Sequence, residues 1–348
     1  MTATSSRQAA PARSSASPEP LSPRRWGCTP HGAGWSVLLP GLGEVHVARL
    51  GWANARNDAG GADALNFLAA LQGEVWGMPP DEWVPANILA ILPDTGGSVL
   101  AAYRAGAGWN AEGWLGFALA AGSSSGVLVS HMLGVRADLR GSHDLGWLLK
   151  AIQGYEALRT GHTTAVWTFD PMRGANARLN LEKLGATVSL LTLDKYGAIR
   201  SDLYGDVPSD RFTARWDLTA DATARRLAAV HEGAYRPPSA EETAHLPEAA
   251  PGAEEPMLRF AIPGDIDRLS REDPAAAMAW RRAMRRVVGS LLDTADALPG
   301  TPPSDPALTR HFTSSNRYTI TGFASSAGED GERRNAYILQ RRGSAGES

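Results

Sequence analysis

Two hydrophobic periods alternate along the chain, and their order predicts a mixed α/β protein. Short apolar runs typical of strands occur between stretches whose apolar residues recur every three or four positions, as on one face of a helix. The predicted strands are EVHVARL (44–50), GSVLAAY (97–103), GWLGFALAA (113–121), GVLVSHMLGV (126–135), TTAVWTF (163–169), TVSLLTL (187–193) and DRFTARWDL (210–218). The predicted helices are ADALNFLAALQGEVWG (62–77), LGWLLKAIQGYEALRTG (145–161) and the stretch 174–184. We therefore expect one sheet with surrounding helices over residues 44–218.

Outside this core the pattern changes. Residues 1–25 are rich in Ser, Ala, Pro and Arg, lack the apolar region of a secretory signal, and are expected to form a disordered tail. Residues 219–255 include an acidic stretch rich in Pro and Ala, which predicts a linker or surface loop. Residues 256–340 return to strand and helix patterns, so we expect a smaller α/β segment packed on the core.

Composition narrows the classes of function. The net charge is −3, so the basic patch that a nucleic acid or an anionic membrane would need is not expected. No run of eighteen apolar residues occurs, which excludes a membrane span of ordinary length. The single cysteine, Cys28, allows no internal disulfide and fits a reducing compartment. We expect a cytoplasmic protein without a metal cofactor.

The segment most typical of a binding site follows the strand 126–135. A basic loop, RADLRGSHD, leads into the apolar helix LGWLLKAIQ. Backbone N–H groups of such a loop and the positive end of the helix dipole favour an anion, and Arg140 adds a charged donor. A tight turn before a helix would give the same pattern, so the loop alone leaves both interpretations open.

The loop resembles a known sequence pattern. LGVRADLRGSHDLGWLL (133–149) is similar to the acyl-CoA pyrophosphate loop of GNAT superfamily N-acyltransferases, L-x-V-x-P-x-x-R-G-x-G-x-G/A-x-x-L-L. Ala137 or Asp138 stands where the family has Pro, and His143 replaces the middle Gly. Gly146 corresponds to the last loop Gly if the loop is one residue longer. The matching residues are Leu133, Val135, Arg140, Gly141, Leu148 and Leu149.

The resemblance extends over about residues 44–340. The motifs SHMLGV, WTFDP and NARLNLEKLGA resemble, in this order, one GNAT subgroup. The resemblance implies a GNAT acyltransferase fold, whose mixed and mostly antiparallel sheet splays at the acyl-CoA site. It also implies transfer of an acetyl or succinyl group from CoA to a primary amine of a small molecule, with an amino acid as one such acceptor. Assembly into a homodimer is compatible with the sequence.

The same resemblance implies where acyl-CoA binds. In GNAT enzymes two neighbouring parallel strands part and admit the thioester, and here these would be 127–135 and 163–169. Backbone N–H groups near Leu133 and Val135 would hold the pantetheine arm, and the helix 174–184 would flank it. The implied cofactor-binding residues are Leu133, Val135, Arg140, Gly141, Ser142, His143, Leu145, Gly146, Asn176 and Asn180.

Four residues are candidates for catalysis. Asp170 could bind or deprotonate the amine, although an Asx turn or helix cap is the simpler reading of Asp-Pro. By strand alternation His131 shares a face with Leu133 and Val135, which suits either an acceptor-site base or a core histidine.

The other two candidates, Glu74 and Tyr196, also have both a catalytic and a structural interpretation. Glu74 ends the first helix, where GNAT enzymes often build the acceptor pocket, but a solvated surface carboxylate is the default. Tyr196 could be the general acid, because Leu181 stands at the helical position where many GNAT enzymes carry a Tyr. Tyr-Gly is also an ordinary turn sequence.

Two other functions compete with acyl transfer. The missing Tyr and the altered loop would also suit a module that binds CoA without turnover. A nucleotide-binding Rossmann protein is disfavoured, because no early strand is followed by G-x-G-x-x-G.

Overall fold

The computed structural model describes residues 17–51, 61–107, 110–141, 143–197, 207–296, 312–313, 317–328 and 331–343. Within these ranges no helix has the length and apolar character needed to cross a membrane. The remaining residues include the predicted loop residue Ser142, which therefore lies outside the described part of the chain.

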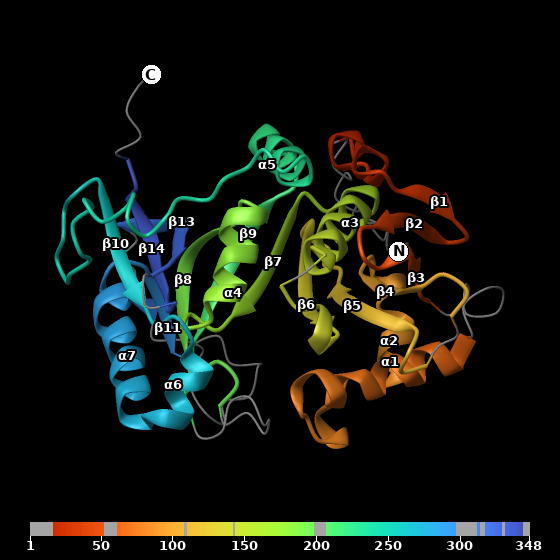
Figure 1. Cartoon of the computed structure of the whole chain (residues 1–348), viewed down its shortest axis with the longest axis horizontal. Coiled ribbons are helices and arrows are strands. Elements are labelled where there is room, and N and C mark those ends of the chain that lie inside the picture. The colour runs from red at the N-terminus through yellow and green to blue at the C-terminus, as the bar shows by residue number, and fades with distance from the viewer. Residues whose placement is uncertain are drawn as a thin grey trace, which may run out of the picture.

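Strands make up one sheet that runs through the molecule (Figure 1). They are β1 (Thr29–His31), β2 (Gly34–Leu39), β3 (Gly43–Arg49), β4 (Ser98–Arg104), β5 (Trp114–Ala121), β6 (Val127–Val135), β7 (Thr164–Phe169), β8 (Thr187–Leu193), β9 (Arg211–Asp217), β10 (Met257–Ile262), β11 (Asp293–Asp296), β12 (Phe312–Thr313), β13 (Tyr318–Ala327) and β14 (Arg333–Arg341).

The helices lie on both faces of this sheet. The α-helices are α1 (Gly61–Trp76), α2 (Ala86–Ile91), α3 (Leu145–Arg159), α4 (Gly174–Ala177), α5 (Asp221–His231), α6 (Ile266–Glu272) and α7 (Pro274–Val287). The π-helical segment η6 (Arg178–Lys183) continues α4. Short 3-10 turns are η1 (Glu19–Leu21), η2 (Pro23–Trp26), η3 (Pro80–Glu82), η4 (Pro93–Thr95), η5 (Ala137–Leu139) and η7 (Val288–Ser290).

The order of the strands shows how the predicted core and the C-terminal segment combine. The path is β1-β2-β3-β4-β5-β6-β7-β9-β8-β13-β14-β10, and β11 adds to β8 in parallel. All other described pairs are antiparallel except β6 with β7. The structure thus confirms a mixed α/β fold with a large, mostly antiparallel sheet. The C-terminal strands continue this sheet through the contact of β13 with β8, where Ile320 pairs with Val188.

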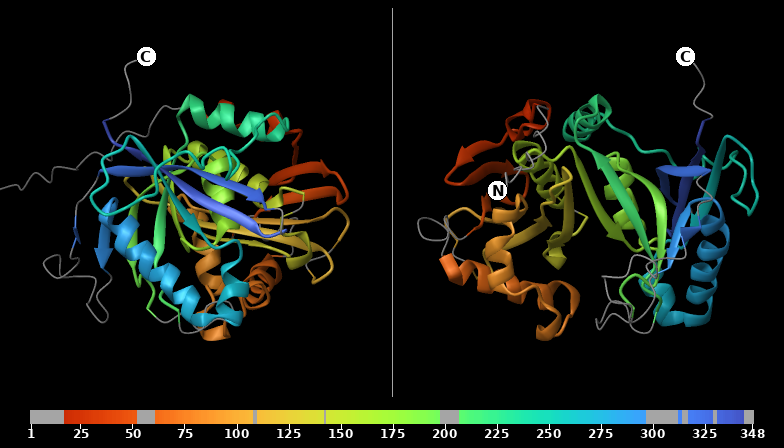
Figure 2. Two further views of the ribbon diagram at one scale, coloured as in Figure 1. Left: turned by 60° about the vertical axis from the view of Figure 1, so that its left-hand side comes forward. Right: turned by 180° about the vertical axis from the view of Figure 1, so that it is seen from behind.

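The two parallel strands β6 and β7 separate soon after they meet. They pair only at Val127–Thr164, Leu128–Ala165 and Val129–Val166, although β6 continues to residue 135 and β7 to residue 169. Figure 2 shows the N-terminal and C-terminal halves of the sheet diverging from this junction. The facing edges of β6 and β7 therefore leave backbone groups beyond the junction without a partner strand.

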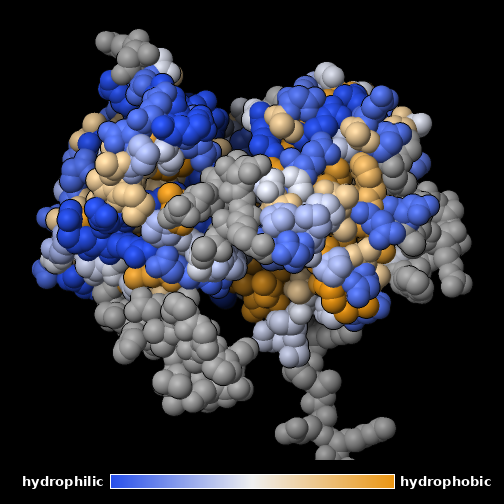
Figure 3. Space-filling view, turned by 90° about the horizontal axis from the view of Figure 1, so that it is seen from below, coloured by the Kyte–Doolittle hydropathy of each residue, from blue (hydrophilic) through white to orange (hydrophobic). Residues whose placement is uncertain are grey.

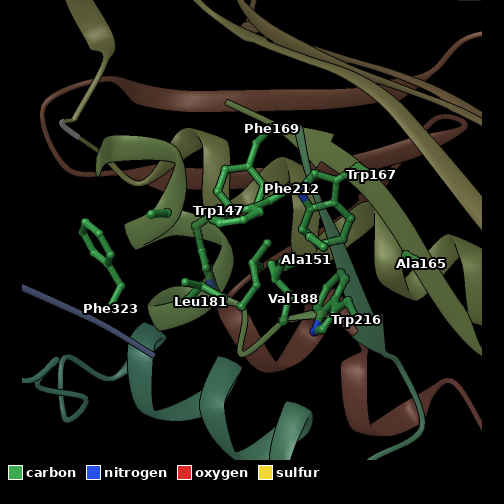
Figure 4. Packing of buried hydrophobic residues seen from close by; sticks show 14 of the residues in the cluster. Trp147, Ala151, Ala165, Trp167, Phe169, Leu181, Val188, Phe212, Trp216 and Phe323 are labelled. Carbon is green, nitrogen blue, oxygen red and sulfur yellow. The ribbon is translucent and has the colours of Figure 1, made fainter. Parts of the chain in front are cut away.

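Each face of the sheet has its own core. On one face α3, α4 and η6 cover a cluster that includes Trp147, Trp167, Leu181 and Trp216 (Figure 4). On the opposite face α1 and α2 cover the N-terminal half with a second apolar cluster. The helices that flank the β6–β7 junction from these two faces are thus α3 on one side and α1 on the other.

Two predicted boundaries need correction. Residues 17–25 are not a disordered tail, because Leu21 is fully buried and Pro23 is also buried, in two turns that pack on α3 and α5. Residues 221–231 are the helix α5, so the predicted linker begins only after this helix. The strands β1 and β2 were not predicted at all.

Candidate functional site

The junction of β6 and β7 is the centre of the candidate site. The β6 strand contains a bulge, because Met132 pairs with Leu119 while Ser130 pairs with Ala120, which leaves His131 as an extra residue. A bulge bends its strand and increases the local twist, which helps to turn β6 away from β7. The gap thus opens directly after the last parallel pair.

The bulge also changes the placement of His131. Ser130 contacts α3 through Lys150, and Leu133 lies beside Gly146 of α3, so both residues face the same side. The alternation that put His131 with Leu133 and Val135 is therefore wrong, since it assumed a regular strand. His131 is exposed to solvent, yet desolvation by the surrounding protein lowers the pKa of its imidazole. A side chain in such surroundings is neutral at pH 7 and able to accept a proton.

A hollow lies between the two halves of the molecule. Figure 3 shows it from below, between the half that carries α1 and the half that carries α6 and α7, with hydrophobic residues on one wall. Val129 of β6 keeps 44% of its surface exposed although it sits in a strand of the central sheet. The face of the sheet opposite α3 is thus open to solvent near the junction.

The loop between β6 and α3 has the backbone of an anion cradle. Gly141, His143 and Asp144 have φ values of +77°, +59° and +51°. Backbone N–H groups that line the concave side of a turn can bind an anion. The loop ends at Leu145, the first residue of α3, so the helix N-terminus adds its partial positive charge. Open space surrounds Gly141, where no atom lies within 4 Å of an added Cβ.

Arg140 and His143 brace this loop. The Arg140 guanidinium donates to the carbonyl of Val135 at 3.1 Å and to that of Val75 at 3.0 Å. Nδ1 of His143 lies 2.7 Å from the carbonyl of Pro40. Two N–H donors of Arg140 are therefore bonded to backbone carbonyls. The predicted phosphate contact would use only the donors that remain. His143, which stands at the middle Gly position, thus links the loop to the turn at Pro40.

Sequence reasoning missed a cation at this loop. Lys183, the last residue of η6, forms an ion pair with Asp144 at the start of α3. The pair links the two helices that border the gap on the α3 face. An ammonium group in this place can also serve a phosphate that occupies the loop.

Helix α4 and η6 place the predicted amides differently. Asn176 is exposed, whereas Asn180 is only 4% exposed and lies in the π-helical turn. The prediction that both face one ligand assumed α-helical spacing, which η6 interrupts. Leu181 is part of the apolar core. Gly146 of α3 lies close to Leu179 of η6, since an added Gly146 Cβ would lie 3.9 Å from the Leu179 side chain.

Asp170 is not available to an amine. Its side chain is fully buried, and Oδ1 accepts from the N–H of Met172 at 2.9 Å, as in an Asx turn. Arg281 of α7 donates to both carboxylate oxygens at 3.1 and 3.0 Å, and Arg281 is itself buried. The catalytic role proposed for Asp170 is therefore corrected: the carboxylate anchors the C-terminal segment to the corner between β7 and α4.

Tyr196 and Glu74 lie apart from this corner. The phenol of Tyr196 is 2.9 Å from the hydroxyl of Thr168 on β7, and the side chain is 49% exposed. Trp167 of β7 faces α3, so its neighbour Thr168 points to the open face of the sheet. Glu74 is exposed near the end of α1, close to Arg136. Tyr196 thus stays a candidate for the acceptor side, and Glu74 has no contact that distinguishes it from a solvated carboxylate.

Among the residues that the structure describes, no three His, Cys, Asp or Glu side chains gather as metal ligands would.

Comparisons with known proteins give only weak likenesses. No protein-family model matches the sequence, and no curated protein matches it. An N-acetyltransferase from Staphylococcus aureus Mu50 is 15% identical, with 50% of this chain and 98% of that chain covered and a TM-score of 0.38. The ribosomal-protein-S18-alanine N-acetyltransferase from Escherichia coli is 13% identical, with 51% and 95% covered and a TM-score of 0.36. At such low identities and TM-scores, these likenesses assign neither an activity nor a substrate to this chain.

Proposed function

We propose that this protein is an acyl-CoA-dependent N-acyltransferase of the GNAT type. The observation that carries the proposal is the parting of β6 and β7 after three parallel pairs, with an anion cradle at the far end of β6. An extended thioester needs a slot lined by backbone hydrogen-bonding groups, and an unpaired strand edge supplies them. The diphosphate of CoA needs the backbone N–H groups and helix N-terminus that the loop 141–145 provides.

The cofactor would enter from the face that α3 and η6 cover. The diphosphate would rest on the loop at Gly141, with Lys183 beside it. The pantetheine arm would follow the unpaired edge of β6 and bring the thioester to the junction. Backbone N–H groups of β6 beyond the bulge would then stabilise the oxyanion, a contribution of about 3 kcal/mol for one well-placed donor.

The acceptor would approach from the open face. His131 follows Ser130, which faces α3, so its side chain would point to this open face. Its lowered pKa keeps the imidazole neutral near pH 7, so it could take the proton of the attacking amine. The amine nitrogen attacks the thioester carbon directly, in a ternary complex. The donor is acetyl-CoA or succinyl-CoA, and the acceptor is the primary amine of a small molecule, with amino acids as the first class to test.

A second candidate function is binding of CoA without turnover. The observation that favours it is the absence of the usual acid: Leu181 lies in the core, and Asp170 is held by Arg281.

One assay separates the two functions. Free thiol release is followed with acetyl-CoA and with succinyl-CoA against a panel of amino acids and simple amines, and CoA binding is measured by isothermal titration. Acyl transfer predicts thiol release that depends on the acceptor and matches the amide formed. CoA binding without thiol release would favour the binding module, and a protein that binds no CoA would contradict both proposals.

A further inference from the structure

A lysine without a counterion lies under the junction of β6 and β7. Lys150 of α3 is only 3% exposed, and its Nζ donates to the hydroxyl of Ser130 on β6 at 2.6 Å. The same Nζ lies 3.9 Å from the centre of the Trp167 ring on β7. A single ammonium group thus contacts both of the strands that part.

The strand register places this contact at the apex of the gap. The last parallel pair is Val129 with Val166, so the next pair in register would be Ser130 with Trp167. That pair does not form, and its two residues are the ones that contact Lys150. The ammonium therefore lies at the first position where β6 and β7 have separated.

Among the described residues, none that contacts Lys150 carries a compensating charge. Ser130, Trp167 and Gln153 form its described polar and aromatic environment, and none of the three is ionisable near neutral pH. Ser130 donates to Oε1 of Gln153 at 2.6 Å, while Nε2 of Gln153 is buried without a partner. Burial lowers the pKa of Lys150 to about 7, with no contribution from a carboxylate.

A buried ammonium of this kind destabilises the fold unless a ligand supplies the opposite charge. A buried ion normally has a partner of opposite charge, and polar groups that lack partners at the same place destabilise the fold further. The cluster presents an ammonium, a hydroxyl and an amide N–H, which together favour a negative charge. In the proposed reaction the negative charge that forms nearest the junction is the thiolate of CoA.

We propose, on the basis of the acyl transfer proposed above, that Lys150 and Ser130 deliver the proton that the departing CoA thiolate takes up. As the carbon–sulfur bond of the tetrahedral intermediate breaks, its electron pair moves to sulfur. The hydroxyl of Ser130 turns from Gln153 to the sulfur and gives up its proton, and Nζ of Lys150 returns a proton to the Ser130 oxygen. Lys150 is left as a neutral amine and regains its proton from water once CoA has left the gap.

This assignment gives the role of the missing tyrosine to a residue of α3. The family position on the helix after β7 is Leu181, which lies in the core. Lys150 reaches the same junction from α3. Its pKa of about 7 suits a group that gives up and regains a proton near neutral pH.

The decisive variant is Lys150→Met, which keeps the length of the side chain and removes the charge. We expect kcat to fall about a hundredfold, the usual contribution of a general acid, while the affinity for CoA is retained. In the wild type, kcat should decline as the pH rises above about 7, where Lys150 loses its proton, and this decline should be absent in the variant. Melting temperature should be unchanged or higher, because the change removes an unpaired buried charge.

Two further variants make the test specific. Ser130→Ala keeps Lys150 but removes the relay, and should lower kcat to a similar extent. Arg159→Met removes a cation from the exposed end of the same helix and should leave kcat and its pH profile unchanged. Normal kcat and a normal pH profile in Lys150→Met would show that the lysine is structural and would overturn the proposal. Loss of succinyl-CoA turnover alone, with acetyl-CoA turnover intact, would mean that Lys150 binds an acyl carboxylate and would also overturn it.

A binding measurement keeps this proposal distinct from the proposed function. The pKa of the thiol of bound CoA is followed by the ultraviolet absorbance of its thiolate, in the wild type and in Lys150→Met. A thiolate beside Nζ would keep Lys150 protonated, and this pairing should hold the thiol pKa lower in the wild type, even if no amine acceptor has been found. Equal thiol pKa values in the two proteins would overturn the role of Lys150 while acyl transfer itself could still be demonstrated. A wild-type protein that binds no CoA would overturn both.

Discussion

Two buried cations near the β7 strand have opposite surroundings. Arg281 of α7 is 4% exposed and donates to both carboxylate oxygens of Asp170 at the end of β7. Lys150 of α3 is 3% exposed and has only a hydroxyl and an indole ring beside it. Folding removes both cations from water. Among the described residues, only Arg281 has a partner of opposite charge.

The difference separates a structural charge from one that is free to act. The Arg281–Asp170 pair balances two opposite charges, and together with the hydrogen bond from Tyr337 to the carbonyl of Pro171 it fixes the C-terminal segment to the corner of the core. Lys150 contributes no comparable bond to the fold. A buried group that can gain or lose a proton near pH 7 without breaking an ion pair is suited to proton transfer.

The largest effect is expected when the Arg281–Asp170 pair is broken. Arg281→Met leaves the Asp170 carboxylate buried without its partner and should lower the free energy of unfolding by about 3–5 kcal/mol. Urea unfolding of the full chain measures this loss. A change as small as that of Lys150→Met would show that the two cations do not differ, and the comparison would fail.

The pH dependence of stability tests the other cation. Because the pKa of Lys150 is lowered from 10.5 to about 7, the unfolded chain binds one more proton than the folded chain between these values. The stability of the wild type relative to Lys150→Met should therefore rise as the pH is raised from about 7 to 10.5, by up to about 1.4 kcal/mol per pH unit. Unfolding curves of both proteins at pH 6, 7, 8 and 9 measure the difference. A constant difference would mean that Lys150 stays charged in the folded protein throughout this range, so that its pKa is not lowered.

A smaller loss is expected one turn further along α7. Arg285 donates to Asp210 at 2.6 and 2.7 Å and to Asp194 at 2.9 Å, but about a third of its side chain is exposed. Arg285→Met should cost about 1–3 kcal/mol, because water can reach part of the site that the arginine leaves. If Arg285→Met loses more free energy of unfolding than Arg281→Met, the burial of the arginine does not determine the size of the loss.

The smallest effect is expected at Tyr196. Tyr196→Phe removes the hydrogen bond to Thr168, worth about 1 kcal/mol, and should change kcat by at most a few-fold. The same kinetic assay as for Lys150→Met measures it. A drop in kcat as large as that of Lys150→Met, with a normal melting temperature, would make Tyr196 the acid instead.

Most of the core fold could be predicted because alternation and helical spacing are local signals. Strands 44–50, 126–135 and 163–169 and the helix from residue 145 lie within a few residues of their predicted places. Leu21 was missed because a single apolar residue among Ser and Pro gives no periodic signal. The helix α5 was missed because few of its residues are strongly apolar, and only Thr223 and Leu227 are buried.

The site was harder to predict because its key relations are not local. Arg281 lies 111 residues from Asp170, so no motif around Asp-Pro reveals the pair. The bulge at His131 and the π-turn at Asn180 break the spacings on which the face assignments relied. Lys150 did leave a signal: it interrupts the apolar run LGWLLKAIQ on the face that also carries Trp147 and Ala151.

A structure of the protein with CoA bound tests the central claim most directly. We predict that the diphosphate lies on the loop 141–144, that the pantetheine arm runs along the edge of β6, and that the thiol lies between β6 and β7, beside Ser130. CoA bound elsewhere, or with its thiol outside the gap, would contradict the account.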